Sequence, residues 1–370
     1  MRVIISGGGT GGHIFPAISI AGALKEIDKT IDILFVGAEG KMEMEKVPAA
    51  GYKIVGLPVA GFHRQFNFKN VCRNLLFPFK HVMSLWKASR IIKDFRPDVA
   101  VGVGGYASGP LLQRAAVRSI PCLIQEQNSF PGVTNRILAA KSAKICVAYP
   151  NMERFFDKEK IILTGNPVRQ SLTAEIDREE SAAAFGLRAD KPVILVIGGS
   201  LGARSINEGI LKSIGEIDGT VQLIWQTGKI YKEDIDKALG DRSREGLVVT
   251  DFIKDMDKAY SLADIVISRA GASSISELAM LGKASILVPS PNVSEDHQTK
   301  NARALESQGA AILVKDDETD TLIARAKEVL GDEGRLKSLR QQVLTFARPN
   351  AARDIAREVI ALAKHREADR

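Results

Sequence analysis

The chain has 370 residues, of which 45% are hydrophobic and 26% charged, and its formal net charge is +7 at pH 7. This composition is typical of a globular chain long enough for two domains, and no apolar run approaches the 18 or so residues that a membrane span needs. The three cysteines, Cys72, Cys122 and Cys146, have spacings that favour neither a disulfide framework nor a zinc site and that fit a reducing cytoplasm.

The basic residues are concentrated in the first half of the chain. Residues 1–167 carry 22 Lys and Arg against 12 Asp and Glu, whereas residues 168–370 carry 29 against 32. No acidic residue occurs between Lys46 and Lys93. This asymmetry indicates an anionic partner of the N-terminal half.

The first element is an apolar strand at residues 3–5, so we expect no signal peptide. It leads into the glycine loop Gly7–His13 and then a helix over 14–25. Glycine lets the backbone approach a ligand, and the helix N-terminus favours negative charge, so the loop predicts a phosphate or sugar-phosphate site. A tight turn without a ligand is one alternative. Another is a nicotinamide enzyme, because Gly7-x-Gly9-x-x-Gly12 also fits the dinucleotide fingerprint.

Strands are expected over 31–36 and 52–57, with a short exposed helix over 40–47 between them. An aromatic and basic loop at 61–69 then precedes a helical stretch over 70–95, interrupted at Pro78. One interpretation is a kinked core helix with a basic outer face, and the other is a patch that docks on an anionic membrane surface. The residues assigned to this patch are Phe62, Arg64, Phe66, Phe68, Lys69, Phe77, Phe79, Lys80 and Trp86.

Two further apolar strands, over 98–103 and 121–124, end in polar or glycine-rich turns. The first is followed by Gly104–Pro110 and the second by Gln125–Asn128. Ligands of open α/β sheets bind outside the carboxyl ends of the strands. The three strand ends therefore predict one site.

A linker is expected at 164–169, where Asn166-Pro167 is a turn signal. Strands expected over 193–197, 221–226, 246–250, 264–268, 284–288 and 310–314 then alternate with helices. This alternation predicts a second doubly wound parallel sheet with helices on both faces. Its first strand enters a second glycine loop at 198–203, and the chain ends in an amphipathic helix over 350–364.

The segment 268–277 is the polar strand end of the second half. Ser274-x-x-Glu277 matches a helix capping box, but Glu277 could also accept hydrogen bonds from a ribose diol. The pairs Asp255/Asp257 and Asp234/Asp236 have metal-like spacing but lie in amphipathic helical sequence, so we expect no metal site.

These motifs together resemble the MurG family of bacterial peptidoglycan glycosyltransferases. The N-terminal ones are Gly-Gly-Thr-Gly-Gly-His at 8–13, Gly-Gly-Tyr-x-Ser-Gly-Pro at 104–110 and Glu-Gln-Asn at 126–128. The C-terminal ones are Gly-Asn-Pro-Val-Arg at 165–169, Gly-Gly-Ser-x-Gly-Ala at 198–203 and Arg-x-Gly-Ala at 269–272 with Ser276-Glu277. They span the whole chain in register.

The resemblance implies a GT-B fold, with two Rossmann-like parallel-sheet domains facing across a cleft. Residues 1–165 would form the acceptor and membrane-docking domain, joined by a C-terminal helix at about 348–370, and residues 166–347 the UDP-sugar donor domain. The implied hexosyltransferase adds N-acetylglucosamine from its UDP donor to the 4-hydroxyl of undecaprenyl-diphospho-N-acetylmuramyl-pentapeptide (lipid I). Inversion would give lipid II and UDP at the cytoplasmic face of the inner membrane, with cell-wall synthesis proteins as further partners and no nucleic acid.

The roles of single residues follow from the same resemblance. His13 is the first candidate for the base and Glu126 the second, while Tyr106 and Ser108 would hold the acceptor diphosphate. The implied donor-side residues are Thr10, Gly11, Gly12, Asn128, Arg169, Ser200, Ile253, Ala272, Ser273, Ser274, Ser276, Glu277 and Gln298. Glu277 would bind the ribose, the Ile253 backbone the uracil, and Ser200 with Arg169 the diphosphate.

Two positions depart from the family pattern, in which His is common at Gln125 and Gln at Leu201. Gln125 cannot supply a titrating group, and a side-chain contact from Leu201 to the donor is in doubt. No cofactor is expected, because helix N-termini and Arg169 can stabilise the leaving diphosphate without a metal.

Three other functions remain open from the sequence. A UDP-sugar 2-epimerase shares the architecture but needs no lipid acceptor. A nicotinamide dehydrogenase would place Glu39 on the adenosine ribose. A non-catalytic membrane scaffold would need neither His13 nor Glu277.

Overall fold

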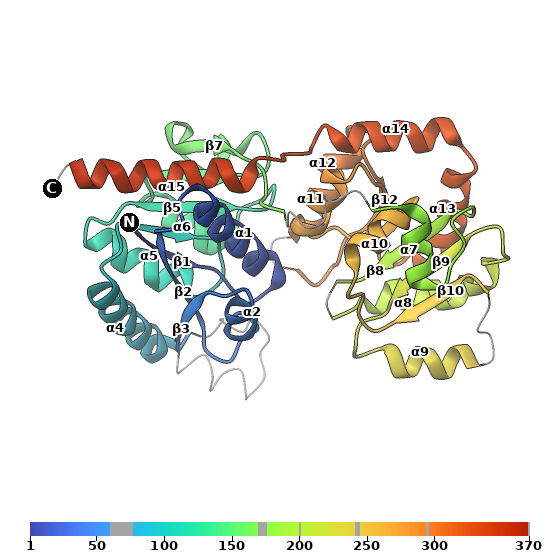
Figure 1. Cartoon of the computed structure of the whole chain (residues 1–370), viewed down its shortest axis with the longest axis horizontal. Helices are drawn as coiled ribbons and strands as arrows, with labels where there is room; N and C mark the ends of the chain where they lie inside the picture. Colours follow the sequence, from blue (N-terminus) through green and yellow to red (C-terminus); the bar gives the residue numbers. More distant parts are fainter. Residues whose placement is uncertain (60–76, 169–175, 200, 241–244, 294–295, 369–370) are drawn as a thin grey trace. The chain divides into compact units, whose positions relative to one another are not determined.

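A computed structural model describes residues 1–370 except 60–76, 169–175, 200, 241–244, 294–295 and 369–370. Its internal contacts divide the chain into two compact units. Unit 1 combines Met1–Val168 with Arg348–Arg370, and unit 2 is Arg169–Ala347. Each unit contains one parallel sheet with helices on both faces (Figure 1).

The sheet of unit 1 has seven strands in the order β3-β2-β1-β4-β5-β6-β7, and every neighbouring pair is parallel. The strands are β1 (Arg2–Ser6), β2 (Asp32–Ala38), β3 (Lys53–Leu57), β4 (Val99–Gly102), β5 (Cys122–Glu126), β6 (Lys144–Val147) and β7 (Ile161–Leu163). Short 3₁₀ turns at Met152–Arg154 and Lys158–Lys160 precede β7.

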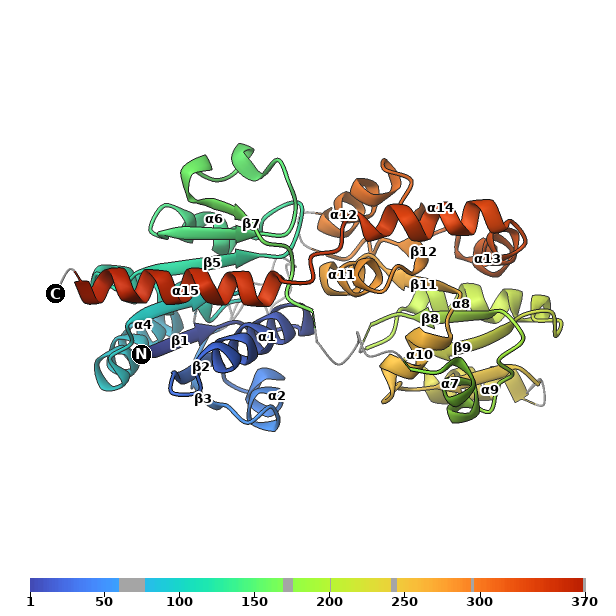
Figure 2. The same cartoon turned by 45° about the horizontal axis from the view of Figure 1, so that its top comes forward.

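Strand β1 shows why both faces of this sheet are covered. Its side chains alternate between faces, so Val3 and Ile5 join one apolar cluster and Ile4 joins the other, and all three are fully buried. Helices α1 (Gly11–Ile27) and α15 (Ala351–Ala368) pack together on the first face (Figures 1 and 2). Helices α4 (Phe77–Phe95), α5 (Ser108–Val117) and α6 (Val133–Ala139) cover the second.

Helix α4 turns some of its large apolar residues outward and others toward the sheet. Ala88 and Ile92 are buried against the sheet, whereas Phe79 and Trp86 are 65% and 67% exposed. The core-helix interpretation is therefore wrong for these two aromatic residues. Pro78 lies in the first turn of α4, where a missing N–H costs no helical hydrogen bond, and the expected helical residues 70–76 lie outside the described residues.

The sheet of unit 2 has six strands in the order β10-β9-β8-β11-β12-β13, all parallel. They are β8 (Val193–Ile197), β9 (Gln222–Gln226), β10 (Leu247–Thr250), β11 (Ile265–Arg269), β12 (Ala284–Val288) and β13 (Ile312–Leu313). The helices are α7 (Arg178–Phe185), α8 (Arg204–Ser213), α9 (Lys232–Leu239), α10 (Met256–Leu262), α11 (Ala272–Met280), α12 (His297–Glu306), α13 (Leu322–Leu330) and α14 (Glu333–Leu344), with 3₁₀ turns at Ile214–Glu216 and Thr319–Thr321. The predicted pair of doubly wound parallel sheets is confirmed.

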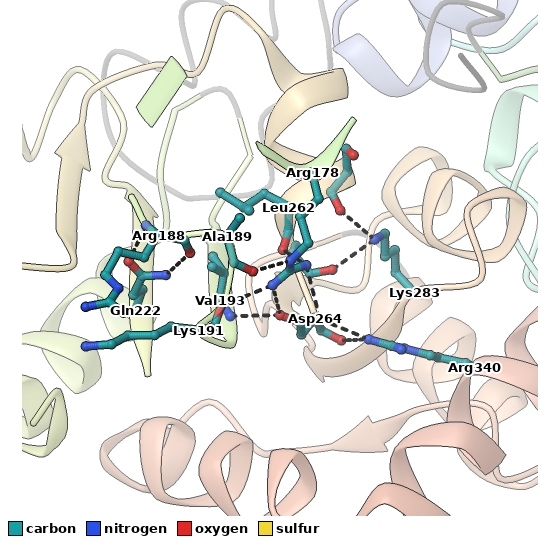
Figure 3. A network of polar contacts seen from close by, with 12 residues as sticks. Arg178, Arg188, Ala189, Lys191, Val193, Gln222, Leu262, Asp264, Lys283 and Arg340 are labelled. Carbon is teal, nitrogen blue, oxygen red and sulfur yellow. Dashed lines mark hydrogen bonds and ion pairs between the residues drawn. The ribbon is translucent and has the colours of Figure 1, made fainter. Parts of the chain in front are cut away.

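A network of polar contacts closes the amino edge of the second sheet (Figure 3). Asp264, just before β11, accepts from the Arg178 guanidinium at 2.8 Å and from the Val193 N–H at 2.9 Å. Arg340 of α14 approaches the same carboxylate at 3.4 Å. Lys283 donates to the Ala263 carbonyl at 2.9 Å, and burial lowers the pKa of its amine to about 8. These hydrogen bonds and ion pairs hold the segments at the amino edge together, so the edge has a structural role.

The strand order places one switch point in each sheet. In unit 1 the chain returns to the far side of β1 when it forms β4, and in unit 2 it returns to the far side of β8 when it forms β11. Loops that leave neighbouring strands in opposite directions separate at such a point, which leaves room for a ligand at the carboxyl edge. Both glycine loops follow the central strands β1 and β8.

Candidate functional site

The first glycine loop joins β1 directly to α1. Thr10 is the N-cap residue of α1 with an extended backbone (φ −144°), but its side chain makes no capping hydrogen bond, and the first turn contains no acidic residue. The first N–H groups of an α-helix have no hydrogen-bond acceptor within the helix. Here the side chain of the N-cap residue does not serve as an acceptor either. The N–H groups of Gly11 and Gly12 therefore suit a negatively charged oxygen.

A buried carboxylate fixes the shape of this loop. Glu43 begins α2 (Glu43–Ala49) and is fully buried, unlike Lys41, Glu45 and Lys46 of the short exposed helix expected over 40–47. It accepts from the Gly9 N–H at 3.0 Å and the Ala38 N–H at 2.9 Å. A Cβ at Gly8 would lie 2.1 Å from its Oε1, so this glycine leaves the space that the carboxylate fills. Sequence reasoning missed Glu43, and only its apolar surroundings could have indicated burial.

His13 lies in the first turn of α1, half-buried. Its Nδ1 is 3.1 Å from the Gly8 carbonyl and 3.2 Å from the Thr10 hydroxyl. A carbonyl oxygen only accepts, so the neutral ring carries its proton on Nδ1 and its lone pair on Nε2. The ring packs on Gly104, where a Cβ would lie 2.9 Å from Nε2. This arrangement gives His13 the tautomer and the fixed orientation that a general base needs.

Glu126, at the end of β5, is 1% exposed and accepts four hydrogen bonds. The donors are the Asn128 N–H and Nδ2, the Gly132 N–H and the Asn135 Nδ2, at 2.8–3.1 Å. Burial raises the pKa of this carboxyl, while the four donors favour its ionised form. The carboxylate therefore shapes the turn after β5 and orients Asn128, which suits a positioning residue better than a base.

The other predicted residues of this edge differ in exposure. Tyr106 is 55% exposed, whereas Ser108 is fully buried with its hydroxyl 2.9 Å from the Ser6 carbonyl and 2.8 Å from the Gly104 carbonyl. Ser108 thus joins two loops, and only its backbone at the start of α5 remains for a ligand. Gln125 is fully buried and donates to Asn166 Oδ1 at 2.8 Å. It contributes a neutral contact where the family pattern has His.

In unit 2 the second glycine loop joins β8 to α8. Ser200 and Arg169, expected to meet the diphosphate, lie outside the described residues. Leu201 is 67% exposed, and its neighbour Gly202 has φ +79°. A Cβ at Gly202 would lie 2.0 Å from the Thr227 carbonyl, so only glycine fits this close approach.

Gln226 connects this loop to the segment expected to recognise uracil. Its Nε2 donates to the Gly199 carbonyl at 3.1 Å, and its Oε1 accepts from the Ile253 N–H at 3.0 Å. The side chain lies at the end of β9 and is 3% exposed. The backbone of Ile253 was expected to face the nucleobase, and its N–H is held by the Gln226 side chain. Gln226 was not among the predicted residues.

Helix α11 carries the predicted ribose site. Its N-cap residue is Gly271, so Ser274 lies inside the helix and the capping-box interpretation is wrong. Ala272 is buried, Ser276 donates to its carbonyl at 2.9 Å, and the Ser273 hydroxyl is buried without a hydrogen bond to any described residue. The Tyr260 hydroxyl donates to Glu277 Oε2 at 3.0 Å. Glu277 is therefore held in position by Tyr260 rather than by the helix end.

Arg269 holds the neighbouring strand ends together. Its guanidinium donates to Asp316 at 2.5 Å, to Ser205 Oγ at 2.8 Å and to the Val288 carbonyl at 3.2 Å. It therefore fixes the start of α8 beside the ends of β11 and β12. Gln298, in α12, accepts from the Ser290 N–H at 2.9 Å, which fixes its amide on the same sheet edge. The sequence showed Arg269 only as part of a motif.

The structure brings the described residues that were predicted for catalysis and for donor or acceptor binding to the carboxyl edge of one sheet or the other. Among the described residues, no group of three or more His, Cys, Asp and Glu side chains could hold a metal ion. No helix in the described part of the chain is long and apolar enough to cross a membrane.

Comparison with known proteins identifies both halves of the chain. Residues 3–147 match the glycosyltransferase family 28 N-terminal domain, and residues 193–358 match the C-terminal domain of the same family. A solved structure, the MurG of Acinetobacter baumannii, superposes with a TM-score of 0.76 at 28% identity, covering 97% of this chain and 99% of that one. The fold and the two glycine-loop edges are thus those of a GT-B glycosyltransferase.

Curated relatives define the family more narrowly. A protein of Bacteroides fragilis is 57% identical over 98% of this chain and 96% of its own length, and one of Porphyromonas gingivalis is 52% identical over 99% and 96%. Both are named UDP-N-acetylglucosamine–N-acetylmuramyl-(pentapeptide) pyrophosphoryl-undecaprenol N-acetylglucosamine transferase. The chain belongs to this family of glycosyltransferases.

Family membership decides among the alternatives left by the sequence. The UDP-N-acetylglucosamine 2-epimerase of Neisseria meningitidis has a TM-score of 0.68 but is only 14% identical, so it shares the fold alone. Glu39, which a nicotinamide enzyme would use for the ribose, is 2.6 Å from Lys87 in an ion pair. The glycosyltransferase interpretation is confirmed.

Proposed function

We propose that the protein transfers N-acetylglucosamine from its UDP donor to lipid I, forming lipid II and UDP. The observation that carries this proposal is the identity of 50–57% over nearly the full length of relatives named for this transfer. In the proposed step the acceptor 4-oxygen bonds to C1 of the donor sugar while the bond from C1 to the β-phosphate oxygen breaks. The configuration at C1 inverts, the hydroxyl proton passes to His13 Nε2, and UDP leaves.

The chain's own groups meet the charge requirements of this step. Negative charge develops on the leaving diphosphate, and preorganised N–H groups stabilise such charge most when they are already in place. The N-terminus of α8, fixed by Arg269, and that of α11 supply such donors. Glu277 would bind the ribose and Gln298 the sugar or phosphates, and the transfer would need no metal ion or other cofactor.

The test is transfer of labelled N-acetylglucosamine from UDP-N-acetylglucosamine, with and without a water-soluble lipid I analogue. We expect UDP and a β-linked disaccharide only when the acceptor is present, and equal rates with and without excess chelator. Conversion of the donor to its 2-epimer without acceptor would contradict the transferase proposal. Strict dependence on added magnesium would contradict the metal-free step.

We also propose that helix α4 docks the enzyme peripherally on the anionic, cytoplasmic face of the membrane. Phe79, Val82, Met83 and Trp86 are spaced along one helix face and are 44–67% exposed. Lys80 flanks them, while residues 62–69 of the predicted patch lie outside the described residues, and nothing is described of the Phe77 side chain. Exposed apolar groups beside cations suit an interface between lipid and water.

Vesicle binding tests this part of the proposal. The variant Phe79→Ser/Trp86→Ser should lose salt-sensitive binding to anionic vesicles but keep its activity on the soluble acceptor. The variant Ile137→Ser/Val117→Ser is a matched control, because both residues are exposed apolar positions on other helices of unit 1. Equal vesicle binding by all three proteins would contradict docking through α4.

A further inference from the structure

Unit 1 contains a cavity of about 550 Å³ at the amino edge of its sheet, at the opposite end of the strands from the glycine loops. It lies where β1 and β4 begin and where α4, α5 and α15 end, and residues from each of these places line it. Ligand pockets of small molecules commonly have volumes of about 300–1,000 Å³. None of the residues assigned to the transfer reaction lies in its wall.

The charged residues in the wall are almost all basic. They are Arg2, Lys93, Arg96, Arg118 and Arg366, with Asp98 as the one acidic residue. A concave surface with one sign of charge concentrates the field inside it, so the cavity attracts anions. Four of the five cations are arginines, whose planar fork of N–H donors matches phosphate oxygens.

Two of the arginines are fixed in place by main-chain carbonyls. Arg2 donates to the Phe95 carbonyl at 3.0 Å, and Arg366 donates to the Pro97 carbonyl at 2.6 Å. Asp98 accepts from the Arg2 backbone N–H at 2.8 Å. These hydrogen bonds to carbonyls orient both guanidinium groups, so this part of the wall is preorganised.

The other three cations of the wall differ from Arg2 and Arg366 in their surroundings. Lys93, Arg96 and Arg118 are exposed, and none forms an ion pair with a described residue. Arg96 follows the last turn of α4 with φ +52°, a left-handed conformation that glycine usually adopts at this position. The Arg96 N–H donates to the Ile92 carbonyl at 2.9 Å, so this backbone conformation ends the helix. The three exposed side chains therefore leave their charges available to an anion in the cavity.

We propose that this cavity binds a phosphate group, as a site separate from the one for the transferred sugar. The phosphate could belong to a soluble phosphate ester or to a lipid headgroup, and both offer the same oxygens to the arginines. Lys93 lies seven residues after Trp86, on the same face of α4, so the cavity also borders the surface proposed to meet the membrane. The site itself does not require that docking to occur.

The test compares three proteins. The variant Arg96→Ser/Arg118→Ser removes two cations from the cavity wall, and Lys141→Ser/Lys158→Ser removes the same charge from exposed positions elsewhere in unit 1. Calorimetric titration with glycerol 1-phosphate, in saturating UDP to occupy the donor site, measures binding of the soluble ester. Flotation with vesicles of phosphatidylglycerol in phosphatidylcholine measures binding of the lipid.

Wild type and the lysine variant should bind at least one probe, with affinity at least tenfold higher than that of the arginine variant. Binding of glycerol 1-phosphate would assign the site to soluble esters, and selective loss of vesicle binding alone would assign it to a headgroup. All three proteins should transfer sugar to a soluble acceptor at the same rate, so failure of this site is distinguishable from failure of the proposed function. Equal behaviour of the three proteins with both probes would overturn the proposal.

Discussion

At the scale of single residues, the two carboxylates predicted for the site have different surroundings. Glu126 is buried and accepts four hydrogen bonds from its own turn, whereas Glu277 lies in the first turns of α11 with a bond from the Tyr260 hydroxyl. A carboxylate that is already saturated by donors gains little from a substrate hydroxyl. These surroundings favour the proposal that His13 accepts the proton and that Glu126 is a positioning residue.

Replacing His13 tests this assignment. His13→Ala should lower turnover about 10²- to 10⁴-fold, the usual contribution of a general base, with UDP affinity nearly unchanged. The measurements are kcat with a soluble acceptor and the Kd for UDP. Glu126→Gln is the comparison, and we expect it to reduce stability as well as activity because it places an amide among four donors. Near wild-type turnover of His13→Ala would return the role to Glu126.

Glu277 should contribute to donor binding rather than to chemistry. Losing a hydrogen bond to a charged group costs about 1.5–3 kcal/mol, so Glu277→Ala should weaken UDP binding about 10- to 100-fold. Tyr260→Phe removes only the bond that orients the carboxylate and should have a smaller effect. Unchanged UDP affinity in a folded Glu277→Ala protein would exclude the ribose contact.

At the scale of elements, the two glycine loops are held by side chains from neighbouring segments. Glu43 of α2 supports the first loop, and Gln226 of β9 supports the second. Neither residue belongs to a glycine motif, and both are buried. The shape of each loop therefore depends on a polar side chain that binds its backbone, as well as on glycine itself.

Removing the Glu43 carboxylate should loosen the first loop. Glu43→Ala leaves the Gly9 and Ala38 N–H groups without their acceptor, and a buried unsatisfied group costs about 1–3 kcal/mol. We expect a lower free energy of unfolding in denaturant titrations and a lower kcat. The exposed neighbour Glu45 provides the control, Glu45→Ala, which should change neither quantity.

The network at the amino edge of the second sheet makes stability depend on pH. Burial, and the nearby Arg340, lower the pKa of Lys283 from 10.5 to about 8, so the unfolded chain binds more protons between these values. Below about pH 8 the amine is charged in both states, and burying this charge lowers the stability of the folded protein by the full amount. As the pH rises towards 10.5, the folded protein gives up this proton before the unfolded chain does, so the loss of stability becomes smaller. The free energy of unfolding of wild type should therefore rise relative to that of Lys283→Met over this range, by up to about 3 kcal/mol.

Chemical denaturation of both proteins at several pH values measures this difference. Lys191→Met removes a lysine from the same region and is the matched control for the loss of one amine. Parallel curves for wild type and Lys283→Met would show that Lys283 titrates normally.

Much of this fold followed from the sequence, because parallel strands buried on both faces form short apolar runs that end in glycine or polar turns. The contacts that side chains make with distant segments could not be predicted from the sequence. The sequence at 40–47 looks polar and exposed, yet Glu43 is buried because Gly8 and Gly37 leave room for it. Ser274 and Glu277 have capping-box spacing, but Gly271 begins the helix three residues earlier. Such contacts depend on tertiary packing, which local patterns do not encode.

At the scale of the whole molecule, unit 1 is assembled from both ends of the chain. Ile355 and Val359 of α15 are fully buried in the same apolar cluster as Val3, Ile14 and Ile20. Truncation at residue 347 should therefore expose this surface and unfold unit 1 before unit 2. Hydrogen exchange should show lost protection in β1 and α1, with β8 and β11 unchanged. Retained protection in unit 1 would show that α15 is dispensable.

This arrangement has a consequence for biosynthesis. A ribosome synthesises most of unit 1 first, but the helix that completes its core, α15, is synthesised only after all of unit 2. Until then the apolar side of α1 has no cover, and nascent chains that expose such surfaces are prone to aggregate or to bind chaperones. The second unit can thus finish folding before the helix that completes the core of the first has been synthesised.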